Sequence, residues 1–337
     1  MALGGFGTEK MISDKGIFIV SLDFELYWGV RDKRTIPDYE NNLKGTGKAI
    51  AEILEVFREY GVHATWATVG FLFFKDEESL KKNYPAKLPQ YANQALSPYL
   101  YINESRKLEA QYHFAPDLIE RIREYPHQEI GTHTFSHYFC QEKPHRPDVF
   151  RLDLSAAIKT GESVGLRIKS MGLPRNQLNR DMLPVLNELG VTTYRGNERS
   201  WAYRPACDTE NNTIPRRAFR LLDAYLNLSG HHTYPIGEVA REKPYNMPAS
   251  RFLRPISQKL SLLEPLRLMR IKKAMTHAAE NKTIFHLWWH PHNFGANTVQ
   301  NIRFLKKILD HYKILKRKYG MQSLNMGQLS DFIDKNM

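Results

Sequence analysis

Residues 15–29 read KGIFIVSLDFELYWG, a short apolar run followed at once by two acids, Asp23 and Glu25. An apolar run of this length bounded by charge predicts a buried strand of a parallel sheet. The carboxyl end of such a strand lies at the rim where α/β folds place their reactive groups. Because residues two apart on a strand share a face, both carboxylates are expected in one pocket. The alternative is a pair of strand-end acids in solvent.

Outward from this strand, extended and helical segments alternate along the chain. Further strands are predicted at 62–69, 128–132, 167–171, 191–194, 283–289 and 322–325, and helices at 43–60, 116–125, 152–164, 180–189, 214–228, 257–281 and 298–319. Alternation of this kind implies parallel strands joined by right-handed crossovers. Roughly seven or eight such units favour an α/β barrel over an open sheet.

No shift in composition marks a domain boundary, so residues 1–337 are expected to form a single domain. Two polar insertions, near 76–113 and 197–212, are expected to cover one face and shape a binding site. The proline-rich residues 230–255 are predicted to be irregular.

The composition is that of an ordinary globular protein, with 42% hydrophobic and 25% charged residues. No apolar run approaches the roughly 18 residues that a membrane span needs. Residues 1–16 lack a charged start followed by an apolar stretch, so no secretory signal is expected. The two cysteines, Cys140 and Cys207, form no disulfide framework, which suits a reducing compartment. The sequence therefore predicts a cytoplasmic protein.

The net charge of +12 is concentrated in the C-terminal region, 251–337. Residues 251–282 carry eight Lys or Arg against two acids, and residues 303–318 carry seven against one. These two stretches account for the whole excess, which suits a phosphate-bearing partner or an anionic membrane surface. The alternative is a pair of solvated helix faces. No aromatic-interleaved basic motif is present, so nucleic acid is not expected as a partner.

A histidine pair, His133 and His137, follows the predicted strand at 128–132 in the stretch HTFSH. Spacing of four on a helical turn places two imidazoles on one side, close enough to share one metal ion. Because the pair follows a strand, it is expected at the same rim as Asp23 and Glu25. Two histidines and one carboxylate form a sufficient ligand set for a catalytic metal. Zinc is the first choice of divalent ion, with iron, cobalt, nickel and manganese as alternatives.

Two further stretches end on this rim. In FHLWWHPHNFG, His286 is expected to be a core residue, whereas His290 falls where the strand should end and would complete an acid–base set. In SMGLPRNQ, Arg175 follows a short strand, where a guanidinium can keep a carboxylate ionised. The alternative for Arg175 is a turn residue in solvent.

Together these pieces resemble the NodB-homology polysaccharide deacetylases, a carbohydrate esterase group of metal-dependent N-deacylases. The matching stretches are, in order, SLDFE, ATWATVG, EIGTHTFSH, MGLPRNQ, TTYRG and LWWHPHNF, which span residues 17–294. The resemblance implies a distorted (β/α)7–8 barrel with an aspartate, two histidines and one metal ion.

The resemblance also implies a role for each matching residue. Asp23 matches the general base, Arg175 the residue that orients this base, and His290 the general acid. The histidines His133 and His137 match the metal-binding pair.

Two departures from the family pattern concern its first and third motifs. The first motif usually has adjacent aspartates, whereas Phe24 follows Asp23 here, so that Glu25 is the natural third metal ligand. The third motif usually has its arginine ahead of the proline, whereas the order here is Pro174-Arg175.

The implied reaction is hydrolysis of an N-acyl group, acetyl or formyl, from an amino sugar in surface polysaccharide or glycolipid biosynthesis. A cytoplasmic enzyme does not meet finished cell-wall polymer, so a nucleotide-linked or polyprenyl-phosphate-linked substrate is expected, with peripheral contact at the inner face of the membrane. The aromatic side chains of Trp28, Tyr194 and Trp201, together with Tyr203, are expected to contact the sugar. The alternative function is a barrel that binds a glycan or a metal without turnover.

Overall fold

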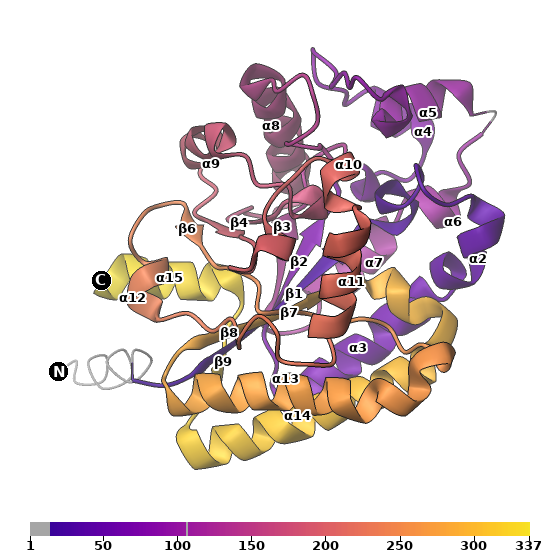
Figure 1. Cartoon of the computed structure of the whole chain (residues 1–337). Coiled ribbons are helices and arrows are strands. Elements are labelled where there is room, and N and C mark those ends of the chain that lie inside the picture. The colour runs from indigo at the N-terminus through magenta and orange to yellow at the C-terminus, as the bar shows by residue number, and fades with distance from the viewer. Residues whose placement is uncertain (1–13, 106) are drawn as a thin grey trace.

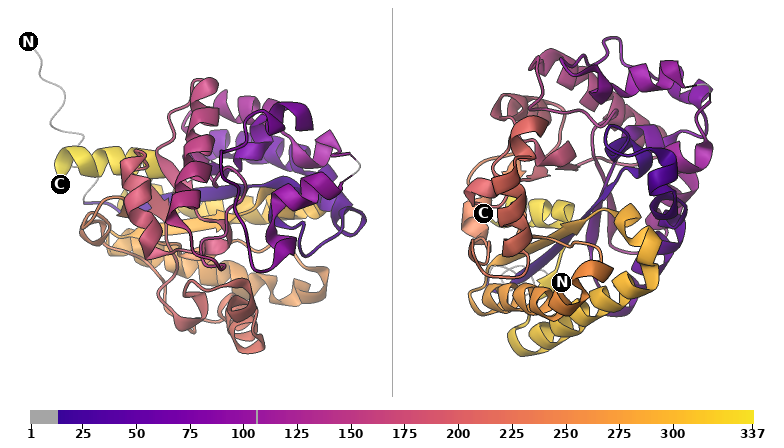
Figure 2. Two further views of the ribbon diagram at one scale, coloured as in Figure 1. Left: turned by 90° about the horizontal axis from the view of Figure 1, so that it is seen from above. Right: turned by 45° about the vertical axis from the view of Figure 1, so that its right-hand side comes forward.

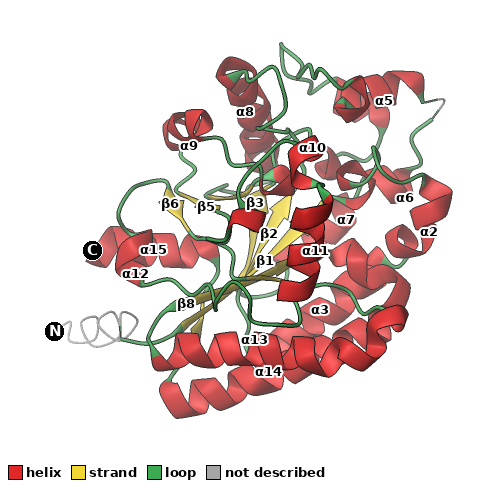
Figure 3. Cartoon of the chain, viewed as in Figure 1, coloured by secondary structure: helices red, strands yellow, loops and turns green. Residues whose placement is uncertain are grey.

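The computed structural model describes residues 14–105 and 107–337 (Figure 1). Within them, parallel strands form one sheet in the order β6-β5-β4-β3-β2-β1-β8-β7, with β9 paired to β1. The strands are β1 (Ile17–Phe24), β2 (Ala64–Thr68), β3 (Gln128–Thr132), β4 (Ser170–Gly172), β5 (Thr193–Arg195), β6 (Tyr245–Asn246), β7 (Arg251–Phe252), β8 (Ile284–Trp289) and β9 (Gln322–Ser323). Figure 3 shows them at the centre, with helices around them.

A single segment of chain closes this sheet toward a barrel. The backbone N–H groups of Tyr245 and Met247 donate hydrogen bonds to carbonyls in and just before β5. Those of Ser250 and Leu253 donate to carbonyls of β8, at the other side of the sheet. The chain thus changes partner within a few residues, and the expected distorted (β/α)7–8 barrel is confirmed. The prediction that 230–255 is irregular was wrong for β6 and β7. These strands are two residues long because prolines in this stretch remove ladder donors.

Helices surround the sheet, as the two views in Figure 2 show. The α-helices are α2 (Ile36–Lys44), α3 (Thr46–Tyr60), α4 (Glu77–Lys81), α5 (Pro98–Glu104), α6 (Ala110–His113), α7 (Pro116–Arg123), α8 (Pro147–Ser163), α9 (Leu183–Glu188), α10 (Asp208–Asn211), α11 (Ile214–Asp223), α12 (Ile236–Val239), α13 (Glu264–Glu280), α14 (Thr298–Tyr319) and α15 (Met326–Asn336). The 3₁₀ turns are η1 (Leu26–Gly29), η2 (Gly70–Phe73), η3 (Gln94–Leu96), η4 (Pro174–Asn176), η5 (Arg180–Met182), η6 (Trp201–Tyr203), η7 (Gln258–Leu263) and η8 (Pro291–Asn297).

The main hydrophobic core lies around β1, every residue of which is buried. Alternate apolar side chains of β1 pack in one cluster with α3, α13 and α14. In α3, Ile50, Ile53, Leu54 and Phe57 recur at three- and four-residue spacing and face this cluster. Burial on both faces explains why β1 has an almost continuous apolar sequence before Asp23.

The helix predicted at 43–60 is two helices, α2 and α3, with Gly45 between them. A side chain at Gly45 would overlap the backbone of Gly295, and a side chain at Gly295 would overlap the backbone of Asn42. The two backbones are therefore in direct contact. This contact fixes η8, the turn that follows β8, against the α2–α3 junction.

The insertion at 76–113 folds into short helices, and its C-terminal end packs against η1, the turn that follows β1. Its last helix ends at His113, whose carbonyl accepts a hydrogen bond of 2.7 Å from the Trp28 indole. Among the described helices, none has the length and apolar character needed to cross a bilayer. Residues 1–13, which hold most of the stretch used to predict the absence of a secretory signal, lie outside the described residues.

Candidate active site

Asp23 and Glu25 lie at the carboxyl end of β1 and are both buried, at 2% and 4% exposed. Asp23 belongs to the strand, and Glu25 begins the η1 turn. A side chain at Gly29 in this turn would overlap the Glu25 carboxylate, so the glycine leaves the space that the carboxylate occupies. Both acids line one cavity, as the shared strand face predicts.

His133 and His137 follow β3, but they are not on a helix. Thr134 and His137 have φ angles of 65° and 59°, in the left-handed region that a continuous helix excludes. Instead, the Asp153 carboxylate accepts a hydrogen bond of 2.8 Å from the backbone N–H of Phe135 and also binds the Ser136 hydroxyl. The helical interpretation of the histidine spacing was therefore wrong. A tight turn braced by α8 brings the two imidazoles together, with ring centroids 5.1 Å apart.

The two imidazoles meet the Glu25 carboxylate. Glu25 Oε2 lies 3.2 Å from His133 Nε2 and 3.0 Å from His137 Nε2. His133 Nδ1 donates to the Gly172 carbonyl at 2.9 Å, which leaves the Nε2 lone pair free toward the cluster. Burial lowers the pKa of His137 to about 4, so its imidazole is neutral at pH 7. Burial alone would raise the pKa of Glu25, but the surrounding imidazoles, His290 foremost, hold it well below its usual range.

This cluster fits a divalent cation. One ligand atom from each of Glu25, His133 and His137 lies within 4.8 Å of the others. Two buried nitrogens, His133 Nε2 and His137 Nδ1, have no hydrogen-bond partner among the described residues. Neutral imidazoles and one carboxylate are the donor set of zinc and related ions, with coordination positions left open.

Arg195 holds Asp23. Its two terminal nitrogens each lie 2.7 Å from one oxygen of the Asp23 carboxylate, and the Arg195 side chain is fully buried. Burial pushes the pKa of Asp23 upward, but the charge and hydrogen bonds of Arg195, together with His133 and His290, outweigh burial, so the pKa of Asp23 is lowered. Asp23 is therefore ionised at neutral pH.

The expectation that Arg175 orients Asp23 was wrong. The Arg175 guanidinium binds the carboxylates of Asp32 and Asp208, at 2.6 and 2.8 Å. Its φ of 55° in the η4 turn sends its side chain across the Phe139 ring, 4.5 Å from the ring centre. The next residue, Asn176, acts on Asp23 indirectly. Its side-chain oxygen accepts a hydrogen bond of 2.9 Å from Arg195, which in turn holds Asp23.

His290 follows β8 and faces both acids. Its Nε2 lies 3.7 Å from Asp23 Oδ2 and 3.6 Å from Glu25 Oε1, and its side chain is 21% exposed to the cavity. His286 is fully buried within β8, where its ring contacts the Ser21 hydroxyl at 2.8 Å and the Met247 carbonyl at 3.0 Å. Burial, reinforced by the Arg195 charge, lowers the pKa of His286 to about 3. His286 is thus a satisfied core residue, as expected, and His290 is the histidine that can exchange a proton with a ligand.

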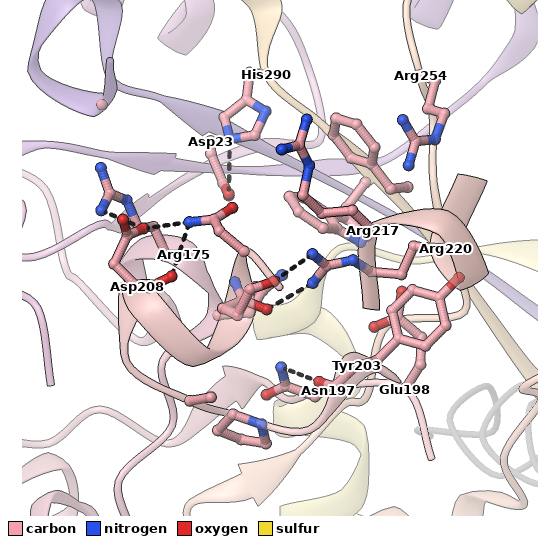
Figure 4. Close-up of a pocket in the computed structure, with 18 of the residues that line it drawn as sticks. Asp23, Arg175, Asn197, Glu198, Tyr203, Asp208, Arg217, Arg220, Arg254 and His290 are labelled. Carbon is pink, nitrogen blue, oxygen red and sulfur yellow. Dashed lines mark hydrogen bonds and ion pairs between the residues drawn. The ribbon is translucent and has the colours of Figure 1, made fainter. Parts of the chain in front are cut away.

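The cavity has a volume of about 830 Å³, and its lining includes several charged side chains (Figure 4). The insertion at 197–212 lines much of it, including Tyr203, whereas no lining residue comes from the described part of 76–113. Of the two insertions, therefore, only the one at 197–212 lines the cavity among the described residues.

Of the four aromatic residues expected to contact the sugar, Tyr203 lines the cavity, whereas Trp28, Tyr194 and Trp201 do not. Trp28 and Tyr194 are buried, at 1% and 4% exposed, because they pack in hydrophobic clusters. Trp201 is exposed, packs at a tilt against Phe219 and is absent from the lining. The aromatic side chains that line the cavity are Tyr203, Phe252 and Trp288.

A family model described as polysaccharide deacetylase matches residues 44–194. Over this segment, which is less than half of its length, the chain is similar to the polysaccharide deacetylases. The matched segment includes the histidine pair and η4, but Asp23, Glu25 and His290 lie outside it. Their assignment to the candidate site therefore depends on the geometry described above.

Solved structures share the fold at low sequence identity. A candidate polysaccharide deacetylase from Mycobacterium smegmatis is 12% identical, with a TM-score of 0.58 over 96% of this chain and 91% of that chain. A GH57-type branching enzyme from Pyrococcus horikoshii is 10% identical, with a TM-score of 0.53 over 96% and 71%. A 4-alpha-glucanotransferase from Thermococcus litoralis is 12% identical, with a TM-score of 0.52 over 96% and 40%. These likenesses establish the fold alone, and a search of curated proteins gives no match.

Sequence reasoning missed three side chains of the candidate site: Arg195, Asn176 and Glu198. Arg195 stands at the end of β5 in TTYRG, so the rule that selected Asp23, a polar residue at a strand end, also applies to it. Asn176 directly follows Arg175 and carried no separate signal. Glu198 lines the cavity yet is 5% exposed, and burial raises its pKa to about 7.

Proposed function

We propose that the protein is a metal-dependent hydrolase that removes an N-acyl group, acetyl or formyl, from an amino sugar. One observation carries this proposal: an ionised aspartate, a Glu-His-His cluster and an accessible histidine face one another in a single cavity. The match to polysaccharide deacetylases supports the reaction class. The whole chain would act as one catalytic domain.

Asp23 is the proposed general base. The Arg195 pair keeps its carboxylate ionised and points it in one direction, and Asn176 holds the guanidinium in turn. A carboxylate so fixed can accept a proton from water that attacks the amide carbonyl. Because Arg195 is fully buried and does not line the cavity, it orients the base without entering the cavity.

Glu25, His133 and His137 are the proposed metal ligands. A divalent ion held by this set, zinc first and iron, cobalt, nickel or manganese as alternatives, would supply Lewis acidity and lower the pKa of water. The Gly172 carbonyl fixes the tautomer and direction of His133. Gly29 leaves room for the Glu25 carboxylate.

His290 is the proposed general acid. An amine is a poor leaving group unless it is protonated as the C–N bond breaks. His290 is the histidine that is accessible from the cavity and also within 4 Å of both acids. The ring of His292 stacks on it, with centroids 5.2 Å apart, and thus helps to hold its orientation.

The substrate is proposed to be a biosynthetic intermediate of surface polysaccharide or glycolipid, joined to a nucleotide or to polyprenyl phosphate. The basic C-terminal region supports an anionic carrier, although fewer of its charges are accessible than the sequence contains. In the stretch 251–282, Arg251, Arg267 and Arg270 are buried, so these charges do not form a free basic face. We place the protein in the cytoplasm, at the inner face of the membrane.

The test combines metal analysis of the purified protein with an assay of amine release from N-acetylated and N-formylated sugars. Metal should be found at one ion per chain, and chelation should abolish amine release. His133→Ala should lose both metal and activity, and the proposal fails if this variant retains both. A barrel that binds without turnover would instead retain its cellular role in Asp23→Asn, which removes the base.

A further inference from the structure

The cavity contains an excess of basic side chains that the proposed hydrolysis does not use. Its lining holds four carboxylates, of Asp23, Glu25, Glu198 and Asp208. Against these stand seven basic residues: Lys33, Arg175, Arg204, Arg217, Arg220, Arg251 and Arg254. Lys33, Arg175 and Arg251 are paired with carboxylates, so the excess lies in the other four.

Three of these arginines face the cavity without a carboxylate partner among the described residues. Arg217 and Arg254 make no side-chain hydrogen bond or ion pair there, and Arg220 donates only to neutral acceptors, the side-chain and backbone oxygens of Asn211. Burial lowers the pKa of Arg220 and of Arg254, and each lies near other cations. Arg220 and Arg254 are partly buried, whereas Arg217 is exposed. Partly buried guanidinium groups near other cations are costly unless an anion joins them.

The group lies beside the reactive residues. Figure 4 shows Arg217, Arg220 and Arg254 along one side of the cavity that also holds His290 and Asp23. Arg254 follows Phe252 by two residues, and the Phe252 ring lies edge-on to His290 with centroids 5.6 Å apart. An anion bound to these arginines would thus belong to the same ligand as the reacting amide.

We propose that Arg217, Arg220 and Arg254 form a subsite for a phosphate ester that is attached to the amino sugar. Guanidinium forks match phosphate oxygens in pairs, which makes arginine the preferred side chain for this ligand. The proposal rests on the proposed function for the identity of the sugar, but not for the binding of phosphate. A nucleotide diphosphate and a polyprenyl phosphate present the same chemistry to this subsite.

The test is equilibrium binding of a matched pair of sugars, N-acetylglucosamine 1-phosphate and methyl N-acetylglucosaminide. The wild-type protein should bind the phosphate sugar more tightly, and Arg254→Gln should reduce this preference by about tenfold. Arg303→Gln, which changes an exposed arginine on α14, is the control and should retain the preference. Comparison of a nucleotide-linked sugar with a short-chain polyprenyl-phosphate sugar then identifies the carrier.

Equal binding of the two sugars by wild type, or an unchanged preference in Arg254→Gln, would overturn the subsite. Tighter binding of a hexuronic acid than of the sugar phosphate would overturn its assignment to phosphate. Because binding needs no turnover, a protein that prefers the phosphate sugar but releases no amine would refute the proposed function alone.

A second observation concerns the outer surface around the cavity mouth. Ten of the sixteen exposed large apolar side chains in the described residues fall within 201–269: Trp201, Ile214, Leu221, Leu222, Leu226, Leu228, Leu262, Leu263, Leu266 and Met269. They belong to η6, to α11 and the turn after it, and to η7 with the start of α13. Ile214 and Leu221 also line the cavity.

These elements form one surface, which we name the leucine surface. Asp223 at the end of α11 is buried and lies 3.7 Å from Arg270 of α13, and Arg270 also donates to the Gly230 carbonyl beyond the turn. The Trp201 ring packs at a tilt against Phe219 of α11, with centroids 5.2 Å apart. Figure 1 shows α11 running down toward α13.

The charge on the leucine surface is positive. In residues 214–228 and 256–273 the acids are Asp223, which is buried against Arg251, and Glu264, which is paired with Arg267. The accessible charges there are cations, among them Arg216, Arg217, Lys259 and Lys273. Exposed leucines flanked by unpaired cations are the pattern of a surface that binds anionic bilayers.

We infer that the leucine surface docks on an anionic membrane and sets the cavity mouth against the lipid headgroups. The test is co-sedimentation with vesicles of phosphatidylcholine, with and without phosphatidylglycerol. Wild type should bind the anionic vesicles, and Leu222→Ser with Leu262→Ser should weaken binding by about tenfold. Ile314→Ser, which changes an exposed side chain on α14, is the matched control and should bind as wild type does.

Absence of binding to anionic vesicles would overturn the docking surface, as would equal binding by the leucine and control variants. A dimer in solution that the leucine variants dissociate would also overturn it, because a second copy would then cover the surface.

Discussion

The Arg195 guanidinium donates to both oxygens of the Asp23 carboxylate at 2.7 Å, and both side chains are shielded from solvent. A buried ion pair of this kind is costly to break, because the remaining partner stays charged in a poorly solvated site. We therefore expect Arg195→Met to lower the free energy of unfolding by about 3–5 kcal/mol.

A double-mutant cycle separates Arg195 from Arg175. Adding Asp23→Asn to Arg195→Met should recover part of the lost stability, because no unpaired carboxylate remains. The same addition to Arg175→Met should be additive, since Arg175 binds Asp32 and Asp208 instead. Urea denaturation of the single and double variants measures both coupling energies. Coupling of Asp23 to Arg175 in place of Arg195 would contradict the assignment.

Asp23 and Glu25 should respond differently to loss of charge. Asp23→Asn should retain the metal and reduce kcat by about 10²–10⁴-fold, because it removes the proposed base alone. Glu25→Gln should weaken metal binding itself, since the carboxylate lies against both histidines. Metal content and amine release, measured on the same preparations, give the comparison. Equal metal loss in the two variants would refute the division of roles.

His290 and His286 give a second matched pair. His290→Gln should lower kcat by about 10²–10⁴-fold with the metal retained, because its ring is the accessible proton donor. His286→Gln should act mainly on stability, since it disturbs hydrogen bonds to Ser21 and Met247 in the core. Steady-state kinetics and thermal unfolding separate the two effects. A larger fall in kcat for His286→Gln would reverse the assignment.

Glu198 should make stability depend on pH. Burial raises its pKa from 4.5 to about 7, so the folded protein binds a proton that the unfolded chain releases between these values. Stability from this group is therefore present below pH 4.5 and is lost as pH rises toward 7, by at most about 3 kcal/mol. Glu198→Gln should remove this slope. Urea denaturation from pH 4.5 to 7.5 tests it, and parallel curves for the variant and wild type would exclude the shift.

The contact between Gly45 and Gly295 predicts an intolerance of side chains. Gly295→Ala should lower the free energy of unfolding by about 1–3 kcal/mol, because its Cβ would overlap the backbone of Asn42. Gly237→Ala is the control, since nothing lies within 4 Å of its added Cβ and the site is helical. It should be neutral or slightly stabilising. Thermal unfolding of both variants measures the difference, and equal stability would mean that the backbones can separate.

Local patterns in the sequence are sufficient for most of the fold. An apolar run that ends in acids predicts β1, and helix periodicity predicts α3, α8 and α14. These patterns are reliable because burial on a fixed face requires apolar residues at a fixed spacing. The two-residue strands β6 and β7 carry no such period, so only their pairing with β5 and β8 reveals them.

In the candidate site, too, one part could be predicted from the sequence and another part could not. Asp23 lies at the end of a strand, and Glu25, His133, His137 and His290 follow strands. The carboxyl ends of parallel strands meet at one edge whatever the details of packing. The sequence by itself therefore determined that these five side chains gather there, but not that Arg195, Asn176 and Glu198 join them. Which partner each one binds was decided by tertiary structure alone. Arg175 and Arg195 both stand at strand ends, but backbone angles in η4 turn Arg175 away and leave Asp23 to Arg195. Side-chain direction of this kind depends on the packing of distant segments, which no local pattern records.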